Sequence, residues 1–219
     1  MQVNAPSTKV IVPIFSGLGT TTAISETWLN QSLSDSLSYP GSLLLQSCYR
    51  AFLTELASLS SEHLSLLGIS FDDFPTPTSL LTDGRNTNHI LLSHSFLFLS
   101  QALRWLSVND YSQQDTLLQS FDIGCLSFSL GVLIAPVVAS SANLLEYLCS
   151  AVEAYKVTLW IGIRVQLHHY RNLSSIAPRD LSWSIVCAGI TPLAARRLIA
   201  DFHAAVSEIN LPPPSPAFF

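Results

Sequence analysis

The stretch Leu126-Ser127-Phe128-Ser129-Leu130-Gly131-Val132 decides the expected fold, because it places a serine between an apolar strand and the start of a helix. Ser129 ends the strand-like run, and Gly131 follows two residues later. Such a sharp strand-to-helix turn is typical of a nucleophile elbow, in which small neighbours let the helix pack close to the strand. The pattern also arises by chance in a serine-rich chain, so its surroundings decide whether it carries chemistry.

A second glycine turn lies near the N-terminus of the sequence. The β-branched run Lys9–Phe15 leads directly into Ser16-Gly17-Leu18-Gly19, which predicts a buried strand followed by a tight turn. A backbone without a Cβ atom lets its amide approach a ligand closely. We therefore expect main-chain donors from both glycine turns to point at the Ser129 oxygen.

The remaining apolar periodicity predicts helices. Leucines and aromatic residues recur at helical spacing over residues 42–59, 87–107, 146–170 and 191–207. Thr191 and Pro192 suit the cap and first position of the last helix. Residues 181–190 are rich in β-formers, and 71–77, with two aspartates and two prolines, predicts a loop. Strands alternating with helices favour the α/β class.

Composition excludes several functions. Hydrophobic residues make up 48% of the chain and charged residues 11%, against roughly 25% in an average soluble domain. The net charge of -5 and scattered basic residues leave no surface for nucleic acid. The charge-free stretch 123–145 contains Pro136 and no flanking positive charge, so we interpret it as buried strand, turn and helix rather than a membrane span.

The four cysteines are far apart and show no metal-ligand spacing. We expect reduced, buried thiols, no metal and no cofactor. The apolar run near the N-terminus is too short for the core of a signal peptide. A cytoplasmic location follows as the expectation.

The order of several segments resembles one known family. Phe15–Thr20, Gln101–Trp105, the elbow at 126–132, Val137–Ser141 and Val152–Tyr155 follow one another as in the starter-unit acyltransferase domain of fungal non-reducing polyketide synthases. The resemblance covers nearly the whole chain, and its specificity lies in the order of the segments rather than in any one motif.

The resemblance implies a fold and a division of the chain. Residues 1–170 would form an acyltransferase core of the α/β-hydrolase-like kind, and 171–210 part of an inserted ferredoxin-like subdomain. Residues 211–219 would be a proline-rich tail. Ser182–Pro192 looks like the first strand and helix of the insert.

The resemblance also assigns roles to residues. Ser129 takes the nucleophile position, which is cysteine in many members. Where malonyl-selecting relatives place an arginine, Trp160 and Ile161 imply an acyl pocket for a neutral chain. Backbone groups of four residues are implied around the oxyanion: Gly17, Leu18, Leu130 and Gly131.

The family's catalytic histidine comes from a segment beyond the inserted subdomain. This sequence ends at Phe219, about halfway through that subdomain, so we expect the matching histidine to be absent. A serine hydroxyl needs a general base, because almost none of it is ionised at neutral pH. The six histidines present are better explained as capping, surface or core residues.

Three functions therefore stay open. The chain would transfer an acyl group from coenzyme A or a carrier-protein thioester through Ser129, with a polyketide synthase or acyl carrier protein as partner. Alternatively, it would be a catalytically inactive, truncated acyltransferase that serves as a binding partner. A third interpretation is a pocket that guides a non-covalent cyclisation or isomerisation of a polyketide. The open edge of an incomplete subdomain predicts self-association.

Overall fold

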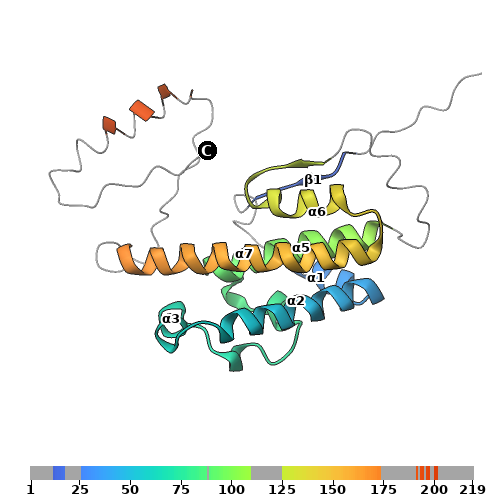
Figure 1. Cartoon of the computed structure of the whole chain (residues 1–219), viewed down its shortest axis with the longest axis horizontal. Helices are drawn as coiled ribbons and strands as arrows, with labels where there is room; N and C mark the ends of the chain where they lie inside the picture. The colour runs from blue at the N-terminus through green and yellow to red at the C-terminus, as the bar shows by residue number, and fades with distance from the viewer. Residues whose placement is uncertain are drawn as a thin grey trace, which may run out of the picture. The chain divides into compact units, whose positions relative to one another are not determined.

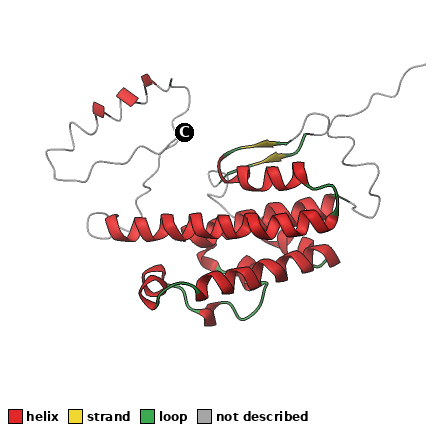
Figure 2. Cartoon of the chain, viewed as in Figure 1, coloured by secondary structure: helices red, strands yellow, loops and turns green. Residues whose placement is uncertain are grey.

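The computed structural model describes residues 12–17, 26–87, 89–109 and 125–173, together with 191, 193–194, 196–197 and 200–201. The chain divides into two compact units, residues 1–176 and 177–219. The first unit is mainly helical with one small sheet (Figures 1 and 2). In the second unit, the described positions between 193 and 201 are helical, and the Ala194 amide donates to the Thr191 hydroxyl at 3.2 Å, which confirms the predicted cap.

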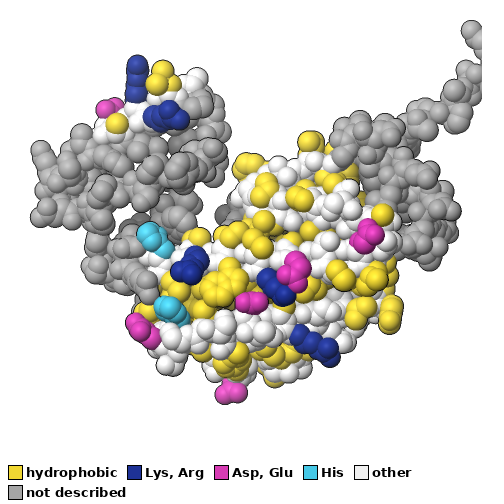
Figure 3. All heavy atoms as spheres, in the orientation of Figure 1, with side chains coloured by type: hydrophobic (Ala, Val, Ile, Leu, Met, Phe, Trp, Pro, Cys, Tyr) yellow, Lys and Arg dark blue, Asp and Glu magenta, His cyan; other side chains and the backbone are white. Residues whose placement is uncertain are grey.

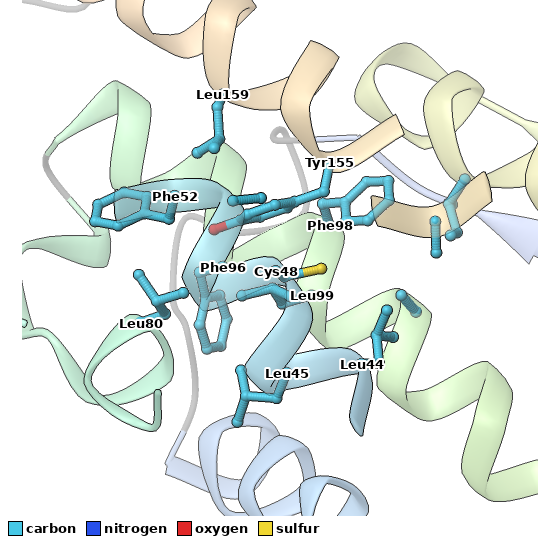
Figure 4. Packing of buried hydrophobic residues seen from close by; sticks show 14 of the residues in the cluster. Leu44, Leu45, Cys48, Phe52, Leu80, Phe96, Phe98, Leu99, Tyr155 and Leu159 are labelled. Atoms are coloured by element: carbon cyan, nitrogen blue, oxygen red, sulfur yellow. The ribbon is translucent and has the colours of Figure 1, made fainter. Parts of the chain in front are cut away.

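Three long helices build the core of the first unit: α2 (Tyr39–Ala57), α5 (Ile90–Val108) and α7 (Leu144–Leu173). Every residue of α5 from 91 to 100 is buried, because α7, α2 and α1 (Glu26–Ser36) all pack against this helix. Figure 4 shows the aromatic and leucine side chains that fill the space between them. The ring centroids of Phe52 and Phe74 lie 4.8 Å apart, in the edge-to-face arrangement that aromatic pairs prefer.

Short elements complete the helical body. They are α3 (Ser61–Leu67), η2 (Phe71–Asp73), α4 (Ser79–Thr82) and η3 (Gly84–Thr87) between α2 and α5, and η5 (Ser129–Leu133) and α6 (Ile134–Ser140) before α7. The predicted loop at 71–77 thus contains a turn of 3-10 helix. The reason is a capping box, in which the Asp73 carboxylate accepts from the Ser70 amide at 2.9 Å.

Buried polar side chains tie the long helices together. The Gln166 side chain of α7 accepts a hydrogen bond from the Ile90 amide at 2.7 Å, so α7 supplies a partner for a backbone amide in the first turn of α5, which has none within its own helix. The Tyr147 hydroxyl donates to the Ala102 carbonyl at 3.0 Å, and the Tyr155 hydroxyl is hydrogen-bonded to Ser95. These contacts fix the register of α5 against α7.

The sheet consists of β1 (Ile14–Phe15) and β2 (Leu126–Ser127), which pair in parallel. Figure 1 shows the strands beside α6, on the side of the α5–α7 pair away from α2. Phe15 is buried, and its ring meets Trp105 of α5 edge-on at 6.2 Å. Ile14, by contrast, is 72% exposed.

The two predicted strands are present, but the prediction that both are buried was wrong. Both residues of β2 are exposed, with Leu126 at 57%, and in β1 only Phe15 is buried. Residues 9–11 of the predicted run 9–15 lie outside the described residues. The physical reason is that side chains alternate across a strand, and only the Phe15 side of this sheet meets a helix. The expected acyltransferase core is therefore a proposal, since the described residues form helices and two short strands.

The predicted helices at 42–59, 87–107 and 146–170 are confirmed as α2, α5 and α7. The predicted strand at 181–190 and the proline-rich tail lie outside the described residues. Among the helices that are described, none is long and apolar enough to cross a membrane. The same part of the chain shows no group of three or more side chains that could hold a metal ion.

Candidate active site

Backbone hydrogen bonds bring the two glycine turns of the sequence together. The Leu126 amide donates to the Pro13 carbonyl and the Phe128 amide to the Phe15 carbonyl, both at 2.9 Å. The pairing sets Ser127 beside Phe15, so the chain segments that leave the two strands start side by side. Residues 16 and 17 therefore run along the start of η5.

Ser129 has a backbone conformation that its residue type rarely adopts. Its φ is 54°, the left-handed region, and within the described residues no other residue except glycine has a positive φ. A side chain in this region costs of order 1 to 3 kcal/mol, and such strain persists only where the surrounding structure enforces it. The residue lies where β2 ends and η5 begins, and its side chain is exposed.

Two glycines enforce the turn by close approach of the backbone. A Cβ atom on Gly17 would lie 2.2 Å from the Ser129 Cβ and 2.7 Å from its Oγ. A Cβ atom on Gly131 would lie 2.3 Å from the Phe15 carbonyl oxygen. Both glycines are buried, and any other residue at either position would force the segments apart.

Together these features have the geometry of a nucleophile elbow. A strained serine stands at a strand-to-helix turn, with the backbone of another turn pressed against it. In enzymes that form covalent serine esters, a turn of this kind holds the nucleophile. The predicted closeness of residue 17 to Ser129 is confirmed, whereas the catalytic role of Ser129 stays a prediction.

The other predicted site residues are placed less directly. Leu130 is half-buried in η5, and Leu18 lies outside the described residues. The Trp160 indole donates to Glu55 of α2 at 2.9 Å, and the Arg164 guanidinium lies over its ring. Ile161 is 38% exposed on α7. These contacts belong to the packing and surface of α7, so the acyl-pocket role of Trp160 and Ile161 stays a prediction.

The described part of the chain shows no hydrogen bond between the Ser129 hydroxyl and a histidine. His89 caps α5, and its Nε2 lies 2.8 Å from the Leu67 carbonyl oxygen. His94 is buried against α7, where burial lowers the pKa of its imidazole to about 4. His89 is thus a capping histidine of the core, as predicted, whereas the buried Nδ1 of His94 has no hydrogen-bond partner among the described residues, so His94 is not the satisfied core residue that was expected. His203 lies outside the described residues.

Two of the three described cysteines, Cys48 and Cys125, are poor nucleophiles, whereas the third, Cys149, is exposed and departs from the expectation of buried thiols. Cys48 is fully buried between α2 and α7, and burial raises the pKa of its thiol far above the usual range. Burial also raises the pKa of the Cys125 thiol, which lies just before β2. A thiol with a raised pKa carries little thiolate and reacts slowly. Cys149 is exposed on α7.

Sequence reasoning missed one residue beside the elbow. The Gln101 side chain of α5 donates from Nε2 to the Ser16 carbonyl oxygen at 2.8 Å. A polar side chain that interrupts the apolar run of a buried helix was the available signal. Its partner could not be predicted, because Ser16 lies 85 positions earlier in the sequence.

Comparison with known proteins gives the family. Residues 32–216 match the family model described as "Starter unit:ACP transacylase in aflatoxin biosynthesis". The chain belongs to this starter-unit acyltransferase family. The elbow at Ser129 lies inside the matched residues, whereas Gly17 precedes them, and the structure places this glycine against the elbow.

Three curated proteins are similar to the chain. It is 34% identical over 208 residues to orsellinic acid synthase armB of Armillaria mellea, and 33% identical over 207 residues to that of Armillaria ostoyae. It is 30% identical over 195 residues to an orsellinic acid synthase of Beauveria bassiana. The matches cover 90%, 90% and 85% of this chain, but only 9%, 9% and 8% of those proteins. No solved structure matches the chain.

Proposed function

We propose that the chain forms the nucleophile-bearing part of a starter-unit acyltransferase of fungal polyketide biosynthesis, and that Ser129 carries the acyl group. The observation that carries this proposal is the left-handed Ser129, pressed against Gly17 and followed by Gly131. Membership of the family supports it independently, because the matched residues include this elbow. The expected fold around the elbow is the family's acyltransferase core.

The proposed reaction has two steps. The Ser129 oxygen attacks the carbonyl carbon of an acyl thioester of coenzyme A or a carrier protein; a C–O bond forms, the C–S bond breaks, and the hydroxyl proton passes by way of a general base to the leaving thiolate. An acceptor thiol on a carrier protein then reverses these events and takes the acyl group. Backbone amides of Leu18 and Leu130 would stabilise the negative oxygen in both steps.

The general base is the unassigned group in this proposal. The family resemblance implies that a histidine from a segment beyond the inserted subdomain fills this role. Without a general base, the same elbow would still bind an acyl thioester or a polyketide synthase, but it would not transfer an acyl group. The exposed apolar side chains beside the elbow, Ile14 at 72% and Phe128 at 65%, favour such binding as the second candidate function.

The test is covalent labelling of the whole chain. The protein is incubated with coenzyme A thioesters of short neutral acyl chains and analysed by intact mass spectrometry. We expect one acyl adduct, which Ser129→Ala abolishes. Ser127→Ala is the matched control, because Ser127 is an exposed serine two residues away on β2, and it should keep the adduct.

A second variant tests the geometry of the elbow independently of a general base. Ser129→Cys places a thiol in the same geometry, and a thiol is a few per cent ionised near pH 7 without a base. Labelling of Ser129→Cys together with silence of the unmodified chain would favour the binding function. Silence of both proteins across the whole panel would contradict the acyltransferase proposal.

A further inference from the structure

The segment that presses on Ser129 is attached to the helical body by two side chains of α5. Trp105 packs against the Phe15 ring, and Gln101 donates to the Ser16 carbonyl oxygen at 2.8 Å. The Gln101 Nε2 also lies 3.4 Å from the Ser16 hydroxyl oxygen. Residues four apart share one face of a helix, so these two residues form a single support beneath residues 15 and 16.

The α5 backbone that carries this support is held in place by close packing. The neighbours of Gln101 within α5 are buried, with Ser100 at 1% and Ala102 at 0% exposed, and the Ala102 carbonyl is itself held by Tyr147 of α7. Gln101 is half-buried, so its amide keeps limited contact with water. A side chain fixed by packing positions its partner more precisely than a loop does.

The contacts continue from Ser16 to the nucleophile without a gap. Gly17 follows directly, and its Cα faces the Ser129 side chain so closely that a Cβ would overlap with it. On the other side, Gly131 packs against the carbonyl groups of Phe15 and Ser16. A displacement of Ser16 would therefore move Gly17 relative to the Ser129 oxygen.

We propose that Gln101 is a positioning residue, which sets the place of the Ser16–Gly17 backbone over the Ser129 hydroxyl through the hydrogen bond to the Ser16 carbonyl. The inference rests on the proposed function, since the reaction it serves is acyl transfer at Ser129. The hydrogen bonds of the Gln101 side chain go to Ser16 and not to the Ser129 hydroxyl. Its contribution is geometric, and a misplacement of about 1 Å costs about 100-fold in rate.

The test compares three variants. Gln101→Met keeps the length of the side chain and removes the donor. Gln101→Glu also removes the donor while its carboxylate is ionised, but the protonated acid donates again. Gln46→Met is the matched control, because Gln46 is an exposed glutamine of α2 whose amide bonds only to Ser42, at 3.3 Å.

The first measurement is the rate of acyl adduct formation as a function of thioester concentration. We expect Gln101→Met to lower the maximal rate by about 10- to 100-fold, with the half-saturating concentration unchanged within about twofold. Gln46→Met should react like the parent chain. An equal loss in Gln46→Met, or a change confined to the half-saturating concentration, would overturn the assignment.

The second measurement tests whether the Gln101 side chain acts as a hydrogen-bond donor or only fills space. The rate of Gln101→Glu relative to the parent chain should rise as the pH falls from 7.5 to 5, because protonation of the carboxyl restores the hydrogen bond to the Ser16 carbonyl. Gln101→Met should show no such recovery. A flat ratio for Gln101→Glu would show that the side chain only fills space.

A third measurement does not need acyl transfer. In a Ser129→Cys background, two measurements report the same geometry: alkylation by iodoacetamide at position 129, which peptide mass spectrometry separates from alkylation of the exposed Cys149, and hydrogen exchange of residues 12–17. We expect Gln101→Met to change the alkylation rate and to speed exchange of 12–17, while exchange in α2 stays constant. If the parent chain forms no adduct but these changes occur, the proposed function fails and the positioning role stands. If neither changes, the positioning role fails.

Discussion

The helical core and the elbow are held together by different forces. In the core, side chains such as Phe52, Phe96 and Tyr155 are completely buried, and removal of their apolar surface from water stabilises the fold. In the elbow, Phe128 is 65% exposed, and Ser129 has a strained backbone held by close approach of glycines. Burial of apolar side chains in the core therefore raises the free energy of unfolding, whereas the strained backbone of the elbow lowers it.

The largest expected effect comes from the core. Phe52→Ala removes a fully buried ring that packs on Phe74, and we expect a loss of about 3–5 kcal/mol in the free energy of unfolding. Phe128→Ala is the control of the same type in the elbow, with an expected change within about 0.5 kcal/mol. Urea unfolding followed by circular dichroism measures both, and similar losses for the two variants would contradict the comparison.

Gly131→Ala tests the fit of the elbow itself. The new methyl group would overlap with the Phe15 carbonyl, so the strands must separate, at a cost of about 1–3 kcal/mol. Acyl labelling at Ser129 should be lost as well. Gly84→Ala is the control, since a Cβ there meets nothing within 4 Å. Full labelling of Gly131→Ala would show that the contact is not needed for reactivity.

A pH series tests the core through His94. Burial lowers the pKa of this imidazole from 6.5 to about 4, so the unfolded chain binds more protons between these values. The stability contributed by the neutral imidazole is complete above pH 6.5 and is lost as the pH falls toward 4. We expect a loss of about 2 kcal/mol between pH 7.5 and pH 5 from this residue.

The variant His94→Gln isolates that effect. His94→Gln should flatten the dependence of unfolding free energy on pH, whatever it does to stability at pH 7.5. An unchanged slope in His94→Gln would assign the titration to another residue, such as His89, whose pKa is also lowered by burial.

The backbone strain at Ser129 predicts a smaller effect. Ser129→Gly should unfold with a free energy about 1 kcal/mol higher than Ser129→Ala, because glycine adopts a positive φ without cost. In the middle of α7 the order should reverse, with Ser150→Gly about 0.5–1 kcal/mol less stable than Ser150→Ala. The same order at both positions would argue against a left-handed Ser129.

The exposed apolar side chains of the elbow predict self-association of the chain. The variant that tests this prediction should have the smallest effect on the free energy of unfolding. Leu126, Phe128 and Ile14 are all more than half exposed, and Figure 3 shows further hydrophobic side chains among the charged ones on the visible face. We expect concentration-dependent association in light scattering, and Phe128→Ser should weaken it while changing unfolding by less than about 0.5 kcal/mol. A monodisperse monomer at high concentration would contradict this prediction.

The same contrast explains what could be predicted from the sequence. The core helices were predictable because leucines and aromatic residues repeat at helical spacing over 42–59 and 146–170. The position of the elbow was predictable from Ser129 and Gly131. The exposure of β2 and the contact of Gln101 with Ser16 were not, because both depend on segments far apart in sequence that only the folded chain brings together.

The pairing of Ile14 with Leu126 also has a consequence during synthesis. Because the two residues are about 110 positions apart, the first strand leaves the ribosome roughly 5–20 seconds before its partner exists, at ordinary elongation rates. Helices α1, α2 and α5 are synthesised in that interval, whereas α7, which packs against both α2 and α5, is synthesised only after β2. The strand pair below Ser129 and the helical core are therefore both completed late in synthesis, by segments that follow one another in the chain.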